Sequence, residues 1–493
     1  MKRIVCFLLL LTMLGAVLAS CSGGSSNPPE STEPMTDGTD GRSESEKLPV
    51  RDLGGKFSIL NNNSNFAYTM MTADSDTANQ VEYAIYQRNM AIENKLNIEI
   101  HENRVSYSEG QEIFNRLASA GSTEYDLYFN ESWIVTSQAL SGFMYDLNSL
   151  QSLRLDQPWW NQTALADLAI GTMLFGILGD LHLMANEATW IVAYNQTLAG
   201  QLNLGSYYDM VNDGSWTFDA LFADILVGAQ DLDGEPGLKV GTADIFGVAC
   251  YHGVVTPFLK AAGQEIIVRD ENNLFAYHGI SEYTETVYTK IVNGIFENAS
   301  AKAALQWNTP GLEDDNYTFH DVFYSGNALF YMDCIGSLKK FADMENDYGV
   351  LPFPKYSADQ EKYTSTIARY CSMGCIPIMV NDPERSAVIM EYLATYSYDG
   401  VTPEYVDTLL EDRYIRDPES QDMIRLIFAN RSVDVAGTYS IGATATGVAD
   451  GVAERVCAAA SYVQPSLGNY VDEIRGRIER DLEDILLYYG AMN

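Results

Sequence analysis

Apolar and polar residues alternate along the first part of the chain with two different periods. Short apolar runs predict strands, whereas apolar positions at helical spacing, as at Val81, Ala84 and Ile85, predict amphipathic helices. Between residues 56 and 129 the pattern predicts strands at 56–60, 97–101 and 125–129 and helices at 76–96 and 107–120. Strands that alternate with helices at this spacing are typical of an α/β fold with a largely parallel sheet.

A second alternation follows after a break. Residues 131–180 are mixed and mainly helical, and residues 181–194 form an extended apolar run. The pattern then predicts helices at 217–229 and 253–263, strands at 245–251 and 326–333, and extended segments at 349–354 and 369–380. From Asp382 the chain is mostly helical, ending in an amphipathic helix over 467–489. A chain of 493 residues is too long for one hydrophobic core, so we expect two domains.

The amino terminus has the pattern of an export signal. Lys2 and Arg3 precede a short apolar run, and small residues lead to Leu18-Ala19-Ser20-Cys21. A cysteine at the cut site resembles the lipobox of bacterial lipoproteins. This resemblance implies cleavage after residue 20 and a lipid such as palmitate on Cys21, with the protein outside the cytoplasm and anchored to the cell membrane. The alternative is a plain secretory peptide with an incidental cysteine.

Residues 21–53 have the composition of a flexible tether. Gly, Ser, Pro, Thr and acidic residues dominate, and large apolar residues are almost absent before Leu48, so the segment cannot bury enough surface to fold. No later segment has 18 consecutive apolar residues. We therefore expect contact with the membrane through the lipid anchor only.

Composition excludes some classes of partner. The formal net charge of −37 would repel nucleic acid and anionic headgroups, so we expect no nucleic-acid partner. Five cysteines would remain beside Cys21, an odd number that does not indicate a disulfide framework, and Cys371 and Cys375 would lie about 13 Å apart on a strand. Buried thiols are the favoured interpretation. We expect no metal and no cofactor, since the five histidines lack ligand spacing to the cysteines.

Several short motifs occur in an order that resembles a known family. They are Gly142-Phe143-Met144-Tyr145-Asp146-Leu147, Tyr194-Asn195-Gln196, Gly214-Ser215-Trp216-Thr217-Phe218-Asp219, Ala261-Ala262-Gly263-Gln264, Gly326-Asn327-Ala328-Leu329, Gly349-Val350-Leu351-Pro352-Phe353-Pro354 and Asn381-Asp382-Pro383-Glu384. Their order resembles that of the extracellular solute-binding proteins of ABC transporters, in the sugar-binding branch that includes maltose-binding protein. No single motif is specific, but the order extends over roughly residues 55–490.

The resemblance implies a two-lobed periplasmic-binding-protein-like fold of type II, with a hinge between the lobes. It places residues 54–187 and 346–400 in an amino-terminal lobe, and residues 188–345 and 401–493 in a carboxy-terminal lobe. It implies a monomeric binding protein, not an enzyme, that holds a carbohydrate, expected to be an oligosaccharide, between its lobes. The implied protein partner is the permease of an ABC transporter.

The candidate ligand-binding residues follow predicted strands, because open α/β sheets bind ligands beyond the carboxyl ends of their strands. They are Asn62, Asn63, Asn65, Glu131, Trp133, Tyr251, His252, Asp333, Arg369 and Tyr439. Aromatic rings suit the C–H faces of sugars, and short polar groups suit their hydroxyls. Some have a plainer alternative: a solvated turn for the asparagines, core packing for Trp133, a structural role for His252 and a helix cap for Asp333. Trp216 is expected to be structural.

Other functions remain open from the residues alone. Paired carboxylates are common in an acidic chain, so a secreted glycoside hydrolase or protease is not excluded, although no G-x-S-x-G in a strand-helix setting, H-E-x-x-H or P-loop occurs. A binder of a non-sugar solute such as a peptide or polyamine, and a tethered adhesin or sensor, would share the fold. Residues 231–235 invite a calcium interpretation, but Asp244 is too far along the chain for that loop and a turn is favoured.

Overall fold

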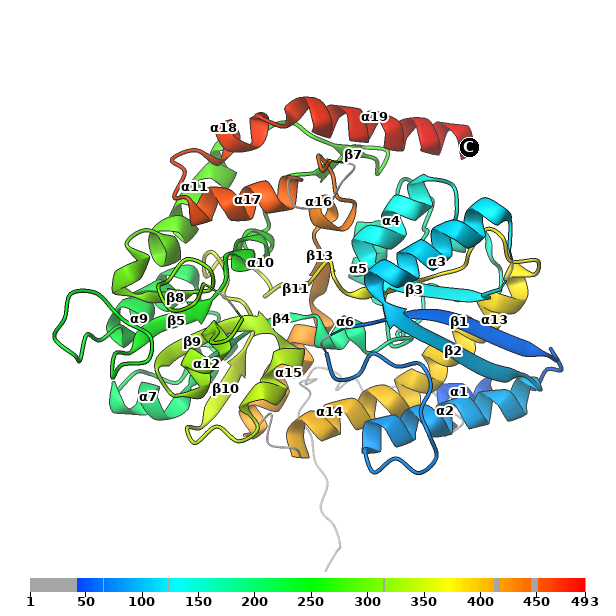
Figure 1. The fold of residues 1–493 in the computed structure, drawn as a ribbon, viewed down its shortest axis with the longest axis horizontal. Helices are drawn as coiled ribbons and strands as arrows, with labels where there is room; N and C mark the ends of the chain where they lie inside the picture. Colours follow the sequence, from blue (N-terminus) through cyan, green and yellow to red (C-terminus); the bar gives the residue numbers. More distant parts are fainter. Residues whose placement is uncertain are drawn as a thin grey trace, which may run out of the picture. The chain divides into compact units, whose positions relative to one another are not determined.

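The computed structural model describes residues 42–492 except 65, 123, 314, 412–416 and 445–450. The predicted export signal, Cys21 and most of the predicted tether therefore lie outside the described residues. From Ser43 onward the described chain contains one four-stranded and one five-stranded sheet, with helices around each of them (Figure 1). This is the α/β architecture that the alternation predicted.

The four-stranded sheet has the order β12-β3-β1-β2. Strand β1 (Lys56–Asn63) runs parallel to β2 (Glu99–Ser106) and to β3 (Leu127–Glu131), while β12 (Ser372–Cys375) is antiparallel to β3. Capping residues set the ends of the helices that connect these strands. Helix α2 (Gln80–Leu96) starts at the cap Asn79, and α3 (Tyr107–Ala120) starts at the cap Ser106 and stops at Gly121, whose φ is +64°.

The five-stranded sheet has the order β10-β4-β9-β5-β8. Its strands are β4 (Trp190–Asn195), β5 (Phe246–Cys250), β8 (Ala303–Leu305), β9 (Ala328–Cys334) and β10 (Tyr348–Leu351). Strand β5 is parallel to β8 and β9, and β4 is antiparallel to β9 and β10. Helix α9 (Phe218–Gly228) lies so close that a Cβ at Gly247 would collide with the backbone of Ile225, so this contact requires glycine.

The remaining elements are mostly helices that flank or connect the sheets. The helices are α1 (Glu44–Lys47), α4 (Ser132–Leu140), α5 (Gln162–Leu168), α6 (Met184–Glu187), α7 (Gln196–Gln201), α8 (Tyr207–Asp213), α10 (Val255–Ala261), α11 (Glu282–Ile291), α12 (Phe319–Tyr324), α13 (Pro383–Tyr396), α14 (Thr402–Glu411), α15 (Pro418–Ala429), α16 (Val435–Thr438), α17 (Val452–Ser461), α18 (Leu467–Asp472) and α19 (Arg475–Met492). A hairpin joins β6 (Val268–Arg269) to β7 (Phe275–Ala276), and β11 (Ser365–Ile367) pairs with β13 (Arg431–Val433).

The predicted strands and helices are confirmed in type, but the structure differs from the prediction in several places, and the short strands β6, β7 and β13 were not predicted. The run 181–194 is interrupted by α6, and the predicted helix 467–489 is two helices, α18 and α19. Strand β8 was not predicted, because three residues are too few to show a period. Strand β10 pairs with β4, so this part of 346–400 belongs to the second sheet. Otherwise the lobe boundaries stay a prediction.

Three chain segments that cross between the sheets are hydrogen-bonded to one another. The amide of Ala368, just after β11, donates to the carbonyl of Ala188 at 2.9 Å, and Thr189 forms a bridge with Ile367. Strands β11 and β13 pair in parallel from Ser365–Arg431 to Ile367–Val433. In Figure 1 this small sheet lies between the two large ones, near α6. The crossings therefore form one connected element.

The last part of the predicted tether is ordered. The backbone amide of Ser45 donates to Asp399 at 2.6 Å, and the hydroxyl of Tyr392 donates to the carbonyl of Pro49 at 2.5 Å. Leu48 is buried. Residues 43–53 thus pack against α2 and α13, although their composition predicted coil, because tertiary contacts supply the burial that the segment lacks by itself.

Core packing agrees with the predictions for tryptophan and cysteine. Trp216 is fully buried and its Nε1 donates to the carbonyl of Pro352 at 2.9 Å, so its structural role is confirmed. Trp159 and Trp160 are also buried. The five cysteines that the structure describes are all free and buried, as predicted. Among the described residues, no helix is long and apolar enough to cross a membrane.

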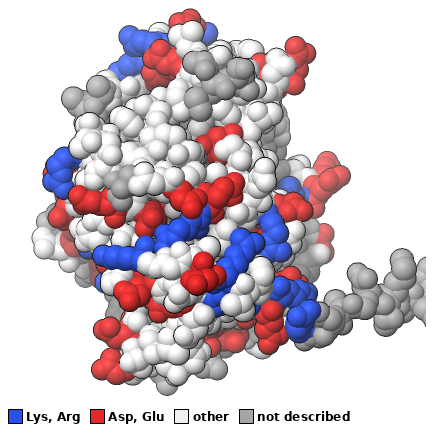
Figure 2. Space-filling view, turned by 90° about the vertical axis from the view of Figure 1, so that its right-hand side faces the viewer, with Lys and Arg blue, Asp and Glu red and all other residues white. Residues whose placement is uncertain are grey.

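The net negative charge does not produce a uniformly acidic surface. Figure 2 shows acidic and basic side chains next to each other on the face that lies at the right of Figure 1. The excess of acidic residues is therefore spread among basic ones on this face.

We expect a pH dependence of stability from His182, which lies beside the ring of Phe129. Its Nδ1 accepts the amide of Met184 at 3.1 Å, and burial lowers its pKa to about 3. In the unfolded chain a histidine has a pKa near 6.5, so on acidification the unfolded state takes up a proton before the folded state does. The free energy of unfolding therefore falls as the pH drops below about 6.5, by up to about 1.4 kcal/mol per pH unit.

The variant His182→Asn isolates this effect, since an Asn oxygen can replace Nδ1 as acceptor but does not titrate. Urea unfolding at pH 7, 6 and 5 should show a steeper loss of free energy of unfolding in the wild type than in the variant. Parallel losses in the two proteins would rule out His182 as the cause.

Candidate ligand-binding site at the junction of the two sheets

Loops that follow parallel strands of both sheets meet at one place, called here the junction. The ring of Phe66, after β1, stacks on Tyr370 with centroids 6.0 Å apart. A Cβ at Gly336, after β9, would collide with Phe66 and with the carboxylate of Glu187. The thiol of Cys334 lies 3.1 Å from the hydroxyl of Tyr370. The junction therefore contains loop residues from the carboxyl ends of strands in both sheets, which is where α/β sheets bind ligands.

On the side of the first sheet, Glu131, Trp133 and Arg369 form one polar group. Trp133 Nε1 donates to the Glu131 carboxylate at 2.5 Å, and Arg369 forms an ion pair with Glu454. The Ser132 amide donates to the carbonyl of Arg369 at 3.1 Å, which fixes the two segments together. Burial raises the pKa of Glu131, while Trp133 and the charge of Arg369 oppose that rise. Predicted residues distant in sequence are thus brought together here.

On the side of the second sheet, Tyr251 and His252 follow β5. The ring of Tyr251 lies 5.4 Å from Trp190, 5.8 Å from His252 and 5.9 Å from Phe319. Burial lowers the pKa of His252, so its imidazole is neutral at pH 7. A neutral imidazole can both donate and accept a hydrogen bond. The side chain of Tyr251 is hydrogen-bonded to that of Tyr370, the neighbour of Arg369 in the sequence.

The three candidate asparagines at the end of β1 and just after it differ from one another. Asn62 is fully buried, its Oδ1 accepts from Ser372 at 2.7 Å, and its Nδ2 has no partner among the described residues. Asn63 is exposed, and Asn65 lies outside the described residues. Because Ser372 pairs with Glu131 across β12 and β3, Asn62 lies beside the end of β3. Its Nδ2 is therefore a buried donor without a described partner, and it is not exposed at the surface of the junction.

Asp333 and Tyr439 use their polar atoms internally. The Asp333 carboxylate accepts from Ser337 at 2.7 Å and Tyr331 at 3.1 Å, and burial raises its pKa. The Tyr439 hydroxyl donates to the carbonyl of Leu168 at 2.6 Å, and its ring packs on Phe275. These contacts use the polar atoms of both side chains within the fold, and the ligand contacts of both residues stay a prediction.

Sequence reasoning missed three residues of the junction: Phe66, Trp307 and Glu454. Trp307 follows β8, its side chain is 53% exposed, and its ring lies 6.2 Å from Tyr251 and 5.9 Å from His252. It was missed because β8 itself was not predicted. Phe66 followed a run of asparagines that had the signature of a turn. Glu454 is distant in sequence from Arg369 and carried no signal.

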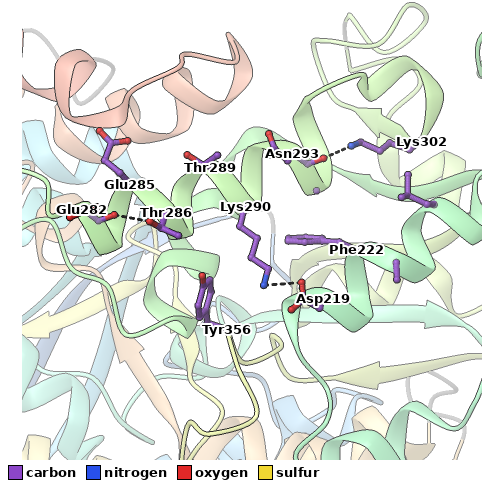
Figure 3. Close-up of a pocket in the computed structure, with 13 residues that line it drawn as sticks. Asp219, Phe222, Glu282, Glu285, Thr286, Thr289, Lys290, Asn293, Lys302 and Tyr356 are labelled. Carbon is purple, nitrogen blue, oxygen red and sulfur yellow. Dashed lines mark hydrogen bonds and ion pairs between the residues drawn. The ribbon is translucent and has the colours of Figure 1, made fainter.

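A cavity of about 680 Å³ lies elsewhere, between α9 and α11 (Figure 3). Lys290 reaches across it to Asp219 at 2.8 Å, and Phe222 and Tyr356 supply apolar walls. Helix α11 continues into a π-helical turn at Val292–Phe296, where a Cβ at Gly294 would collide with Phe222. None of the predicted site residues lines this cavity.

The acidic turn at 231–235 is closed by Asp244. Carboxylate oxygens of Asp231, Asp233 and Asp244 lie within 4.8 Å of one another. Asp244 is too far along the chain for the spacing of an EF-hand loop, but the chain folds back and brings its carboxylate to the turn. The Asp244 carboxylate accepts the amides of Leu232 at 2.8 Å and Lys239 at 3.0 Å, so hydrogen bonds within the turn already use its oxygens.

No family model and no curated protein matches the sequence. Solved structures do match. The chain is similar to UspC of M. tuberculosis, with a TM-score of 0.57 and 14% identity over 86% of this chain and 100% of that one. It is similar to the ABC substrate-binding protein Lmo0181 from Listeria monocytogenes in complex with cycloalternan, with a TM-score of 0.55 and 10% identity over 87% and 99%.

A third match is a cyclo/maltodextrin-binding protein complexed with maltotetraose, with a TM-score of 0.54 and 14% identity over 91% of this chain and 98% of that one. At such low identity these likenesses establish the fold. The chain has the two-lobed α/β fold of periplasmic binding proteins, as predicted.

We expect Tyr439→Phe to lower the free energy of unfolding by about 1–2 kcal/mol, because it leaves the buried carbonyl of Leu168 without its donor. Urea unfolding measures the change. Tyr462→Phe, at a residue that is 67% exposed, is the matched control and should have no effect. Equal stability of Tyr439→Phe and the wild type would show that the hydroxyl contributes nothing to the fold.

Proposed function

We propose that this protein is an extracytoplasmic solute-binding protein that captures a carbohydrate between its two lobes and delivers it to the permease of an ABC transporter. The observation that carries the proposal is the convergence of aromatic and polar side chains from both sheets at the junction. Three structural neighbours support it: one is named an ABC substrate-binding protein and complexed with cycloalternan, one is complexed with maltotetraose, and one is a Thermus thermophilus maltotriose-binding protein bound with maltotriose.

The chemistry of the junction suits a sugar. Trp133 and Tyr251 offer ring faces for C–H surfaces, and the Glu131 carboxylate and the neutral imidazole of His252 offer hydrogen-bonding partners for hydroxyls. The Trp133 indole is held by Glu131, so little side-chain freedom would be lost on binding. In this proposal the lobes close about the crossing segments, a hinge motion of two rigid bodies.

The rival proposal is a surface hydrolase that acts on glycans. It would use carboxylates at the same junction, where Glu131 and Glu454 both lie near Arg369. The structural neighbours named above are called binding proteins and favour the binder. Chromatography of each glycan after incubation with the protein separates the two proposals, since a binder returns the glycan intact.

Isothermal titration against a glycan panel, with amino acids, peptides and polyamines alongside, tests the proposal. We expect at least one neutral glycan to bind, and Trp133→Ala and Tyr251→Ala each to weaken that binding by about tenfold or more, equivalent to about 1.4 kcal/mol. Tyr324→Ala removes a partly exposed aromatic that follows none of the parallel strands at the junction, and should have no effect. Tight binding of a non-sugar with no response to any glycan would refute the sugar assignment.

The lipid anchor on Cys21 belongs to the same proposal, because a tethered binder has a high effective concentration near its permease. Expressed as the full chain in a bacterial host that processes lipoproteins, the wild type should sediment with membranes, and Cys21→Ser should be released to the soluble fraction. Ser22→Ala is the control and should remain bound. Membrane attachment of Cys21→Ser would disprove the anchor and leave the binding proposal intact.

A further inference from the structure

Trp307 stands in an unusual backbone conformation. Its φ is +65°, in the left-handed region, where a bulky side chain is strained and where glycine or asparagine is usual. Among the described residues the other positive-φ residues are Gly, Asn, Ser440 and Val463. Its indole is 53% exposed, so burial of the ring does not explain the strain.

The surrounding loop holds Trp307 in this conformation. Its amide donates to the carbonyl of Leu312 at 2.7 Å, and the side chain of Gln306 donates to the same carbonyl at 3.1 Å. Gln306 is buried and also accepts the amide of Phe319 at 2.9 Å, and Thr309 accepts the amide of Leu305 at 2.9 Å. A loop fixed by this many hydrogen bonds can maintain a strained residue, and such residues concentrate at ligand-binding sites.

Strand register places Trp307 beside two predicted site residues. Cys250 and Leu305 are paired in β5 and β8, so Tyr251 and His252 leave one strand where Gln306 and Trp307 leave its neighbour. The three rings of Tyr251, His252 and Trp307 contact one another pairwise, with centroids between 5.8 and 6.2 Å apart. We call these three residues the Trp307 subsite. None of the three side chains is charged at pH 7, since the pKa of His252 is lowered.

We infer that the Trp307 subsite binds one ring of a neutral oligosaccharide, separate from the ring that is bound by Trp133 and Glu131. The inference rests on the proposed function and deepens it. Trp133 follows β3 of the first sheet and Trp307 follows β8 of the second, and in this proposal the two side chains contact different rings of the ligand. Trp307 then determines the preference for longer chains.

Titration calorimetry with malto-, cello- and xylo-oligosaccharides of one to six residues tests the inference. For the series that the wild type binds, affinity should rise with chain length. Trp307→Ala should lower the affinity for the longest members about tenfold and that for the shortest less than twofold, while Trp307→Phe should preserve the preference. Tyr462→Ala, which removes a different exposed ring, is the control.

The variant Trp307→Gly separates a ligand-binding role from a structural one. Glycine adopts φ of +65° without strain, so its melting temperature should equal or exceed that of the wild type while the preference for long chains disappears. A clear drop in melting temperature would identify Trp307 as a packing residue and overturn the inference.

Two further outcomes distinguish failure of this inference from failure of the proposed function. If the wild type binds glycans but Trp307→Ala keeps both affinity and length preference, the inference fails and the proposed function stands. If the wild type binds no oligosaccharide of any series and no other glycan of the panel, both fail.

Discussion

The hydrogen bonds among the crossing segments determine how the rest of the structure can work. The bond from Ala368 to Ala188 and the pairing of β11 with β13 join the connections between the sheets into one element. Strand β12 begins a few residues after Ala368 and forms the edge of the first sheet beside Glu131. Strand β4 begins directly after Thr189 and belongs to the second sheet. The same few residues therefore fix where the loops of both sheets meet. Any motion of one sheet relative to the other must change the backbone conformation of these segments.

Several buried ionisable groups lie near the crossing segments. Glu187, on α6, accepts the amide of Ala67, and burial raises its pKa. Asp180 has a pKa raised to about 6 by burial, opposed by Arg431 and by a hydrogen bond from Thr402. Such groups are costly unless hydrogen bonds replace water, and here loops from separate elements supply them. Glu187 thus helps to hold the loop that carries Phe66, the neighbour of Ala67.

The fold could be predicted from the hydrophobic period and the order of the motifs, because the longer strands and helices repeat their apolar pattern. The short β8 and the break between α18 and α19 did not, since three or four residues carry no period and tertiary contacts decide them. At the site, Glu131, Trp133 and Tyr251 were predictable as residues that follow strands. The pairing of Arg369 with Glu454, the burial of Asn62 and the position of Trp307 depend on segments distant in sequence, which no local pattern reports.

The six tryptophans provide a physical argument for where the ligand binds. Trp159, Trp160, Trp190 and Trp216 are almost fully buried, as expected for the largest apolar side chain. Trp133 is half-buried and Trp307 is exposed, and both follow strands at the junction. Folding alone would favour burial of both rings. Leaving these two rings uncovered, one of them at a strained φ, lowers the stability of the fold at the junction. A ligand with apolar faces would cover the rings and restore that stability on binding.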